Sequence, residues 1–236
     1  MLDSRRAKTT IQIGKKIVKK FILAFGLLLM TCSSLGTPPP NIAAVQQQIV
    51  YYYESGQYIK DLSKISKEAE NYLRQRITAN RQQKTKEKLA IVFDIDETTL
   101  SNFDTMRNLN FICNHDLIYQ KINSGASPAI PPMLNLYRFA QHHHVAVFFI
   151  TGRPQKLQQV TQTNLHEQGY FAWEGLFMKP ENYREKSVIP YKSAARKQIT
   201  ELGYTIVANF GDQKSDLEGG YSEKNYKLPN PFYLIP

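Results

Sequence analysis

The chain has 236 residues, enough for one large domain or two small ones. Its composition, 42% hydrophobic and 21% charged, excludes an intrinsically disordered or fibrous protein. The net charge of +10 resembles that of nucleic-acid-binding proteins, but residues 1–31 hold seven basic residues and one acidic residue, which leaves +4 for residues 32–236. Because that remainder is only mildly basic and carries no recognised binding motif, we expect no nucleic-acid partner.

Residues 1–36 have the organisation of a secretory signal peptide. A basic stretch over residues 5–20 precedes an apolar run from Phe21 to Met30, and small polar residues follow. About ten apolar residues are too few for a membrane-spanning helix, which needs roughly 20. The pattern therefore predicts an exported protein of the periplasm or cell envelope.

The end of this leader allows two forms of processing. The run Leu29-Met30-Thr31-Cys32 resembles a bacterial lipobox, in which the cysteine becomes a lipidated N-terminus that anchors the protein in a membrane. Thr31 departs from that pattern, where Gly, Ala or Ser is usual, and ordinary cleavage after Gly36 is the alternative. If Cys32 is lipidated, Cys113 remains a lone thiol, and we expect it to be a small buried side chain rather than a nucleophile.

Residues 37–48 are interpreted as a linker and the start of a first helix, because Thr37 is followed by three prolines that form a stiff spacer. The predicted first helix runs from Ala43 to Glu54 and is broken by Ser55-Gly56. A second, amphipathic helix follows, and residues 81–88 form a polar link. Apolar residues recur along that second helix at steps of three or four: Tyr58, Leu62, Ile65, Ala69 and Leu73.

Beyond Lys88, short apolar runs alternate with helical stretches, which indicates βαβ units and a parallel α/β sheet. Buried strands are predicted over residues 89–93, 145–150 and 205–207, and a helix over residues 191–202 is ended by Gly203. Ligands of open α/β sheets bind at the carboxyl ends of the strands. The loops that begin at Asp94, Thr151 and Gly211 are therefore expected along one edge.

The first of these loops carries two carboxylates in the sequence D-I-D-E-T-T-L-S-N, residues 94–102. Asp94 and Asp96, two residues apart beyond a buried strand, can reach one crevice. An EF-hand also begins D-x-D, but Thr98 and Thr99 stand where that loop needs Asp or Asn and then Gly. Taken alone, the motif is equally compatible with two solvated loop acids.

Three further motifs follow in order. Thr151-Gly152 at a strand end offers a hydroxyl and a backbone N–H to an oxyanion. Lys192 stands near a helix start, which the helix dipole slightly disfavours. The run G-D-Q-K-S-D adds Asp212 and Asp216.

Together these four motifs resemble the signature of the haloacid dehalogenase superfamily of phosphotransferases. The strings Y-K-S-A-A-R-K, G-Y-T-I-V-A-N-F-G-D-Q-K-S-D-L and Y-K-L-P-N-P-F-Y-L-I are similar to the subfamily IIIB acid phosphatases, which include plant vegetative storage proteins and bacterial surface-lipoprotein phosphatases. The resemblance covers residues 49–236. It implies a Rossmann-like three-layer parallel sheet, N-terminal helices and a small helical cap within residues 103–133.

The resemblance also implies the roles of individual residues. Asp94 is the nucleophile that forms an aspartyl-phosphate, and Asp96 is the general acid and base, a residue that dehalogenases of the superfamily lack. Mg²⁺ is held by Asp94, the backbone carbonyl of Asp96 and Asp212, while Asp216 acts through water or by orienting its neighbours. Thr151, Gly152 and Lys192 hold the phosphoryl oxygens.

Other polar residues near these motifs receive structural interpretations. Glu97 is expected to support the loop, and Arg153 either faces a phosphate or, as we favour, pairs with an acid. The run of histidines at residues 142–144 is interpreted as the polar end of a helix that begins near Met133. The resemblance to the bacterial members implies that a nucleotide base is held between aromatic rings. The candidates here are Phe103, Tyr119, Trp173 and Tyr221, and core packing is the favoured alternative for each.

The sequence thus predicts an exported, Mg²⁺-dependent acid phosphatase for small phosphomonoesters, nucleoside monophosphates among them. A phosphotransferase that passes the phosphoryl group to an alcohol and a non-catalytic storage or surface-binding protein are the alternatives. The intact Asp94, Asp96, Lys192 and Asp212 argue against the storage protein. No oligomeric state is indicated.

Overall fold

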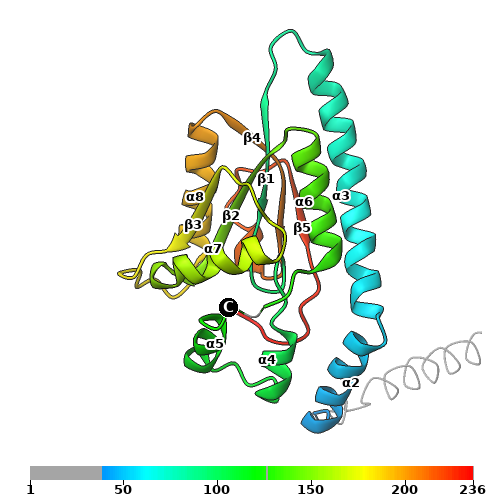
Figure 1. Cartoon of the computed structure of the whole chain (residues 1–236), viewed down its shortest axis with the longest axis vertical. Helices are drawn as coiled ribbons and strands as arrows, with labels where there is room; N and C mark the ends of the chain where they lie inside the picture. Colours follow the sequence, from blue (N-terminus) through cyan, green and yellow to red (C-terminus); the bar gives the residue numbers. More distant parts are fainter. Residues whose placement is uncertain (1–38, 126, 236) are drawn as a thin grey trace, which may run out of the picture. The chain divides into compact units, whose positions relative to one another are not determined.

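The computed structural model describes residues 39–125 and 127–235, and from Ile42 onwards they form one compact unit (Figure 1). The predicted leader, with Cys32 and the start of the proline spacer, lies outside the described residues. None of the described helices combines the length and apolar character that crossing a membrane requires.

A five-stranded parallel sheet organises this unit and confirms the predicted α/β class. Its strands lie in the order β3-β2-β1-β4-β5, so that β1, the first in sequence, is central. The strands are β1 (Lys88–Phe93), β2 (Ala146–Pro154), β3 (Gly175–Lys179), β4 (Tyr204–Gly211) and β5 (Lys224–Lys227).

Helices cover both faces of the sheet and complete three layers (Figure 1). Helices α3 (Gln57–Gln82) and α6 (Pro131–His142) lie side by side on one face, where they pack on Ile91 and Phe93 of β1. Helix α8 (Ile189–Glu201) packs on the other face against Ala90 and Val92. Alternate residues of β1 thus enter two separate cores, which explains why its sequence is continuously apolar.

The N-terminal helices match the predicted pattern. Helix α2 (Ile42–Glu54) ends before Gly56, whose φ of 77° is a conformation that suits glycine, and α3 begins at the next residue. Four of the five predicted positions on α3 are buried, whereas Ile65 is half-buried. Helix α3 continues to Gln82, so its last turn occupies the start of the stretch predicted as a polar link.

Two short helices, α4 (Phe103–Asn108) and α5 (His115–Ile122), form the small helical cap that the sequence predicted. The cap packs against α2: the ring of Phe103 stacks on that of Tyr53, with centroids 3.6 Å apart and an interplanar angle of 4°. Arg107 of the cap also pairs with Glu54 at 2.6 Å. The expectation that Cys113 is buried is wrong: it lies between the cap helices, outside the core, and is exposed.

The remaining elements are short. Helix α7 (Gln158–Glu167) follows the 3-10 turn η1 (Gln155–Leu157), and α9 (Lys214–Leu217) follows β4. The predicted strands at 145–150 and 205–207 are longer than expected, because β2 and β4 continue through polar residues that pair with neighbouring strands. This extension carries the Thr151-Gly152 motif inside β2.

Candidate active site

The carboxyl ends of the strands bring most of the predicted site residues to one cavity. Asp94 follows β1, Gly152 lies near the end of β2, and Asp212 follows β4. Helix α8 supplies Lys192 from the first turn, and α9 supplies Asp216. The predicted residues that line this cavity are Asp94, Asp96, Gly152, Lys192, Asp212 and Asp216.

At the floor of the cavity, Lys192 bridges two carboxylates. Its Nζ lies 2.6 Å from Oδ1 of Asp94 and 2.5 Å from Oδ1 of Asp216, and all three side chains are buried. Burial alone would lower the pKa of Lys192, but the charges of Asp216 and Asp94 outweigh it and raise that pKa. The lysine is therefore a fixed cation at this position.

A third carboxylate leaves the floor with an excess of negative charge. Single oxygens of Asp94, Asp212 and Asp216 all lie within 4.8 Å of one another. Burial raises the pKa of Asp94 well above its ordinary value, since the opposing charge of Lys192 is partly offset by the neighbouring acids. Burial, followed by the charges of Asp216 and Glu97, raises the pKa of Asp212 to about 7. One lysine does not neutralise this cluster.

Such a cluster fits a hard divalent cation. Buried carboxylate oxygens at close spacing are the donor set that Mg²⁺ and similar ions prefer, and the ion's charge would balance the excess. Asp212 is held ready by hydrogen bonds, from Thr98 to Oδ1 at 3.1 Å and from Gln213 and Asn230 to Oδ2 at 2.5 and 2.7 Å. Among the described residues, no other group of His, Cys, Asp and Glu is arranged to hold a metal.

Asp96 lies beside this cluster and is paired with Arg153. Of the two interpretations of Arg153, contact with a phosphate or pairing with an acid, the structure shows the pair with an acid. The guanidinium donates to both oxygens of Asp96, at 2.7 Å in the shortest contact, and the Asn102 amide donates to Oδ1 at 2.7 Å. Burial raises the pKa of Asp96, but Arg153 and the hydrogen bonds outweigh it and lower that pKa. Asp96 is therefore ionised in this arrangement.

The two residues of the Thr151-Gly152 motif lie in different places, Thr151 in the core and Gly152 at the cavity. Thr151 is fully buried, its hydroxyl accepts the Arg153 backbone N–H at 3.1 Å, and it is not among the lining residues. Gly152 lines the cavity, and a Cβ placed on it would meet nothing within 4 Å. Open space thus borders the Gly152 backbone, whereas the phosphate-binding role of Thr151 remains a prediction.

Glu97 joins the loop after β1 to the C-terminal segment. It is fully buried at a φ of 55°, accepts the Asn102 backbone N–H at 2.5 Å and accepts the hydroxyl of Tyr233. Burial and the nearby Asp96 raise its pKa to about 7. This is the supporting role that the sequence suggested. Sequence reasoning assigned no role to Asn102, Asn230 and Tyr233, although each lies within one of the motif strings.

One of the four aromatic candidates lines the cavity. Tyr119 on α5 does so, whereas Phe103 is buried in the core, Trp173 packs edge-on against Phe149, and Tyr221 is exposed. Core packing, the alternative for each of these residues, describes Phe103 and Trp173.

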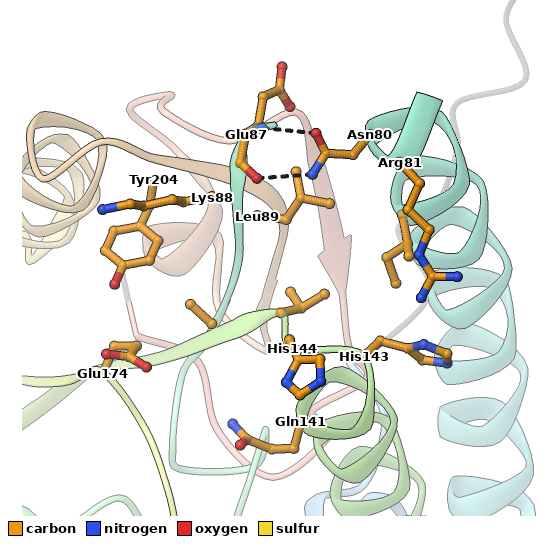
Figure 2. Close-up of a pocket in the computed structure, with 13 residues that line it drawn as sticks. Asn80, Arg81, Glu87, Lys88, Leu89, Gln141, His143, His144, Glu174 and Tyr204 are labelled. Atoms are coloured by element: carbon orange, nitrogen blue, oxygen red, sulfur yellow. Dashed lines mark hydrogen bonds between the residues drawn. The ribbon is translucent and has the colours of Figure 1, made fainter. Parts of the chain in front are cut away.

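A second hollow lies at the opposite, amino ends of the strands (Figure 2). His143 and His144 line it together with Lys88, Tyr204 and Glu174. Asn80 closes its rim by hydrogen bonds to the backbone N–H and carbonyl of Glu87, both at 2.9 Å. The histidine run is thus at the end of α6, as expected, and far from the acidic cluster in the fold.

A parallel sheet that presents buried carboxylates and a lysine at its carboxyl edge beneath a small cap has the architecture of the haloacid dehalogenase superfamily. Within it, the chain belongs to subfamily IIIB, the acid phosphatases, because the profile of that family matches residues 35–236. It is accordingly a phosphomonoester hydrolase by class.

Curated relatives include both enzymes and storage proteins. The chain is 34% identical over 190 residues to the stem 28 kDa glycoprotein of Glycine max, covering 78% of this chain and 72% of that one. It is 31% identical to vegetative storage protein 1 of Arabidopsis thaliana, covering 85% and 73%. Identity to acid phosphatase 1 of Solanum lycopersicum is 36%, over 61% of this chain and 58% of the tomato protein.

Solved structures show the same fold. The class C acid phosphatase from Bacillus anthracis superposes with a TM-score of 0.60 over 80% of this chain and 86% of its own, at 21% identity. Its form with tungstate bound gives 0.61 at 22% identity. At such identities the likeness shows the fold, and the confirmed fold class rests on it together with the sheet topology.

Proposed function

We propose that the protein hydrolyses small phosphomonoesters with the help of Mg²⁺ and through an aspartyl-phosphate on Asp94. The observation that carries this proposal is the buried contact of Asp94 with Lys192, beside Asp212 and Asp216. A carboxylate fixed next to a permanent cation and an unneutralised acidic pair is suited to attack an anionic phosphate only when a metal ion relieves the charge.

The proposed reaction has two steps. An oxygen of Asp94 forms a bond to phosphorus while the ester bond breaks, and Asp96 donates a proton to the leaving alkoxide. Water then attacks the phosphorus of the aspartyl-phosphate while the bond from phosphorus to the Asp94 oxygen breaks. Asp96 takes a proton from the water, and inorganic phosphate leaves with the Asp94 carboxylate restored. Lys192 and the Gly152 N–H, with the hydroxyl of Thr151, hold the phosphoryl oxygens as negative charge develops on them.

Mg²⁺, held by Asp94, Asp212 and the backbone carbonyl of Asp96, would supply charge neutralisation at the phosphoryl oxygens. Asp216 is proposed to position Lys192 and α9 rather than to contact the ion, since one oxygen accepts from Lys192 and the other from the Gln213 N–H at 2.7 Å.

A phosphomonoester panel tests the proposal. The purified protein is assayed on p-nitrophenyl phosphate, methyl phosphate and nucleoside monophosphates, in Mg²⁺ and after removal of metal with EDTA. We expect hydrolysis in Mg²⁺, loss in EDTA and recovery when Mg²⁺ is restored. Full activity in a rigorously metal-free sample contradicts the proposed role of the acidic cluster.

Two alternatives are separated by the same assay. A phosphotransferase would release alcohol faster than phosphate when a second alcohol is present, because the phosphoryl group passes to that acceptor. A storage protein, favoured by the names of some relatives, would release neither. The paired Asp94, Lys192 and Asp216 argue for an enzyme, since storage requires no such arrangement.

We also propose that the protein is exported and anchored through a lipidated Cys32. The names of relatives include glycoproteins, which supports export because glycosylation accompanies secretion. Mass spectrometry of the mature N-terminus tests the anchor: a lipid-modified Cys32 is expected, whereas an unmodified chain that begins at Thr37 contradicts anchoring and leaves the phosphatase proposal intact.

A further inference from the structure

The cavity above the acidic floor has an apolar wall. Cap residues Met106, Ile118 and Ile122 line it, together with Val188 before α8 and Ile235 in the C-terminal segment. The cap side of this wall is itself supported by apolar packing, because Ile122 belongs to a small core with Leu157 and Met178. The phosphate end of a substrate thus meets charge, and its alcohol end meets hydrocarbon.

The polar side chains of the lining are largely engaged with one another. Asp94 and Asp216 pair with Lys192, and Asp96 pairs with Arg153. Of the two side-chain amides, Asn102 donates to Asp96 and accepts from Ser127, and Gln213 donates to Asp212 and accepts from the Ile235 N–H. These amides are therefore not available to recognise the hydroxyls or the base of a nucleoside without breaking existing bonds.

Lys179, at the carboxyl end of β3, is the lining cation outside those pairs. Its ammonium is half-buried in the cavity lining and attracts a phosphate dianion. Its presence therefore agrees with a substrate that has one anionic end.

Three exposed apolar side chains are next in sequence to residues that line the cavity. Ile112, Leu117 and Leu234 are 65%, 41% and 80% exposed. Each is the chain neighbour of a lining residue, namely Cys113, Ile118 and Ile235. Helix α5 and the C-terminal segment line the same cavity and lie close together in the fold (Figure 1).

We infer that the substrates of this site are monophosphates of apolar alcohols, with an alkyl chain seated between α5 and the C-terminal segment. The chemistry of this inference rests on the proposed function, and the preference for an apolar alcohol rests on the apolar wall of the cavity. Each methylene that is buried in such a wall raises affinity up to about fourfold. The preference is expected to grow with chain length and to exceed that for nucleoside or glycerol monophosphates.

Binding of non-hydrolysable n-alkylphosphonates, from methyl to octyl, tests the inference without requiring turnover. The full chain is titrated calorimetrically in Mg²⁺, below the concentration at which the longer ligands form micelles. We expect the Kd to fall about twofold to fourfold per methylene and the heat capacity change to become more negative, the mark of apolar burial. Equal affinity across the series, or tighter binding of adenosine monophosphate than of octylphosphonate, overturns the inference.

A pair of matched variants tests where the alkyl chain of the ligand binds. Ile118→Ser removes a half-buried part of the wall, and Leu202→Ser makes a similar change at an exposed position after α8, outside the cavity lining. The ratio of octyl to methyl affinity should fall about fivefold or more in Ile118→Ser and stay unchanged in Leu202→Ser. If Ile118→Ser keeps the wild-type ratio of octyl to methyl affinity, the alkyl chain does not bind at Ile118 and the assignment is overturned.

Hydrolysis of the matching n-alkyl phosphates separates this inference from the proposed function. Chain-length-dependent binding without hydrolysis of any ester contradicts the proposed function and supports the apolar site. Hydrolysis of methyl phosphate with no gain in kcat/KM and no gain in affinity along the series contradicts the apolar site alone.

Discussion

The guanidinium of Arg153 donates hydrogen bonds to both carboxylate oxygens of Asp96, with Nη2 2.7 Å from Oδ1 and Nε 3.0 Å from Oδ2. The Arg153 side chain is 1% exposed and that of Asp96 is 23% exposed, so the pair spans the boundary between the interior and the cavity. This contact lowers the pKa of Asp96, whereas a general acid must hold a proton. In the proposed reaction a bound phosphate would resolve the conflict, because a negative charge raises the pKa of a neighbouring carboxyl group.

Arg153 should therefore set the alkaline limit of activity. Arg153→Lys keeps the positive charge but loses the two-pronged hydrogen bond, so the pKa of Asp96 rises. Because the protonated form donates to the leaving group, activity falls as the pH rises through that pKa, and a higher pKa moves the alkaline limb to higher pH. A pH profile of kcat for an alkyl phosphate, which reports the pKa in the enzyme–substrate complex, measures the shift. Arg107→Lys, which changes the exposed pair with Glu54, is the control; an unmoved limb in Arg153→Lys contradicts the assignment.

Asp96→Asn should impair substrates in proportion to their need for a proton. The amide cannot donate a proton to an alkoxide, so hydrolysis of alkyl phosphates is expected to fall by about 10²–10⁴-fold. p-Nitrophenolate leaves readily without a proton, and its ester should lose far less in the step that releases it. Rapid-quench or burst measurements of alcohol release compare the two esters. Equal losses for both would show that Asp96 does not act as the acid.

Asp94→Asn should abolish turnover and preserve the fold. An amide is nearly isosteric with the carboxylate but is not a competent nucleophile, and losses of a nucleophile reach about 10⁶-fold in other enzymes. Lys192 keeps its contact with Asp216, so the buried cation retains a partner. Steady-state kinetics and circular dichroism measure the two effects, with Asp104→Asn on an exposed position of α4 as the control. Substantial turnover by Asp94→Asn would exclude the aspartyl-phosphate.

Local patterns predicted the parallel α/β sheet and the edge at which its loops meet, whereas the three layers and the cap followed from the resemblance to the haloacid dehalogenase superfamily. The apolar run before Asp94 and the helical spacing from Tyr58 to Leu73 are determined by burial alone. Strands β3 and β5 were not predicted, since they are short and β5, K-N-Y-K, alternates polar residues at the sheet edge. Cys113 was misplaced because its exposure depends on how the cap packs, which no local pattern records.

The contacts that complete the site are long-range and were equally invisible to sequence patterns. Tyr233 reaches Glu97 across 136 residues, and Asn230 reaches Asp212 from the loop after β5. Both lie in the string Y-K-L-P-N-P-F-Y-L-I, whose similarity to the family indicates no contact partner for either side chain. Spacing along the chain cannot show which carboxylate such a side chain will meet.

The metal-free protein should lose stability as the pH rises. Burial raises the pKa of Asp94 and brings that of Asp212 to about 7, against an ordinary value of 3.8, so the folded state holds protons that the unfolded chain releases. Stability is then highest below about pH 4 for these groups and is lost as the pH approaches 7. Mg²⁺ replaces the protons, so the rise in Tm that it causes should increase from pH 5 to pH 8. Thermal unfolding in Mg²⁺ and in KCl of equal ionic strength measures this.

Asp212→Asn is the matched variant for the metal experiment. It removes one of the buried charges, so the pH dependence of its metal-free Tm should be flatter and its response to Mg²⁺ smaller than in the wild type. A Mg²⁺-induced shift that is largest at pH 5, or that is the same in this variant, contradicts metal binding by the cluster.

Gly211 is expected to tolerate no side chain, because the backbone of β4 passes directly beneath Asp216. A Cβ at Gly211 would lie 2.1 Å from Cβ of Asp216 and 2.5 Å from its Oδ2. Gly211→Ala must therefore push α9 away, which separates Asp216 from Lys192 and from the Gln213 N–H. We expect a loss of about 1–3 kcal/mol in the free energy of unfolding and a weaker affinity for Mg²⁺.

Urea unfolding and metal titration of Gly211→Ala measure the two changes. Gly152→Ala, whose Cβ meets nothing within 4 Å, should retain wild-type stability; if Gly211→Ala is as stable as Gly152→Ala and binds Mg²⁺ normally, the close approach of β4 to Asp216 does not hold the site together.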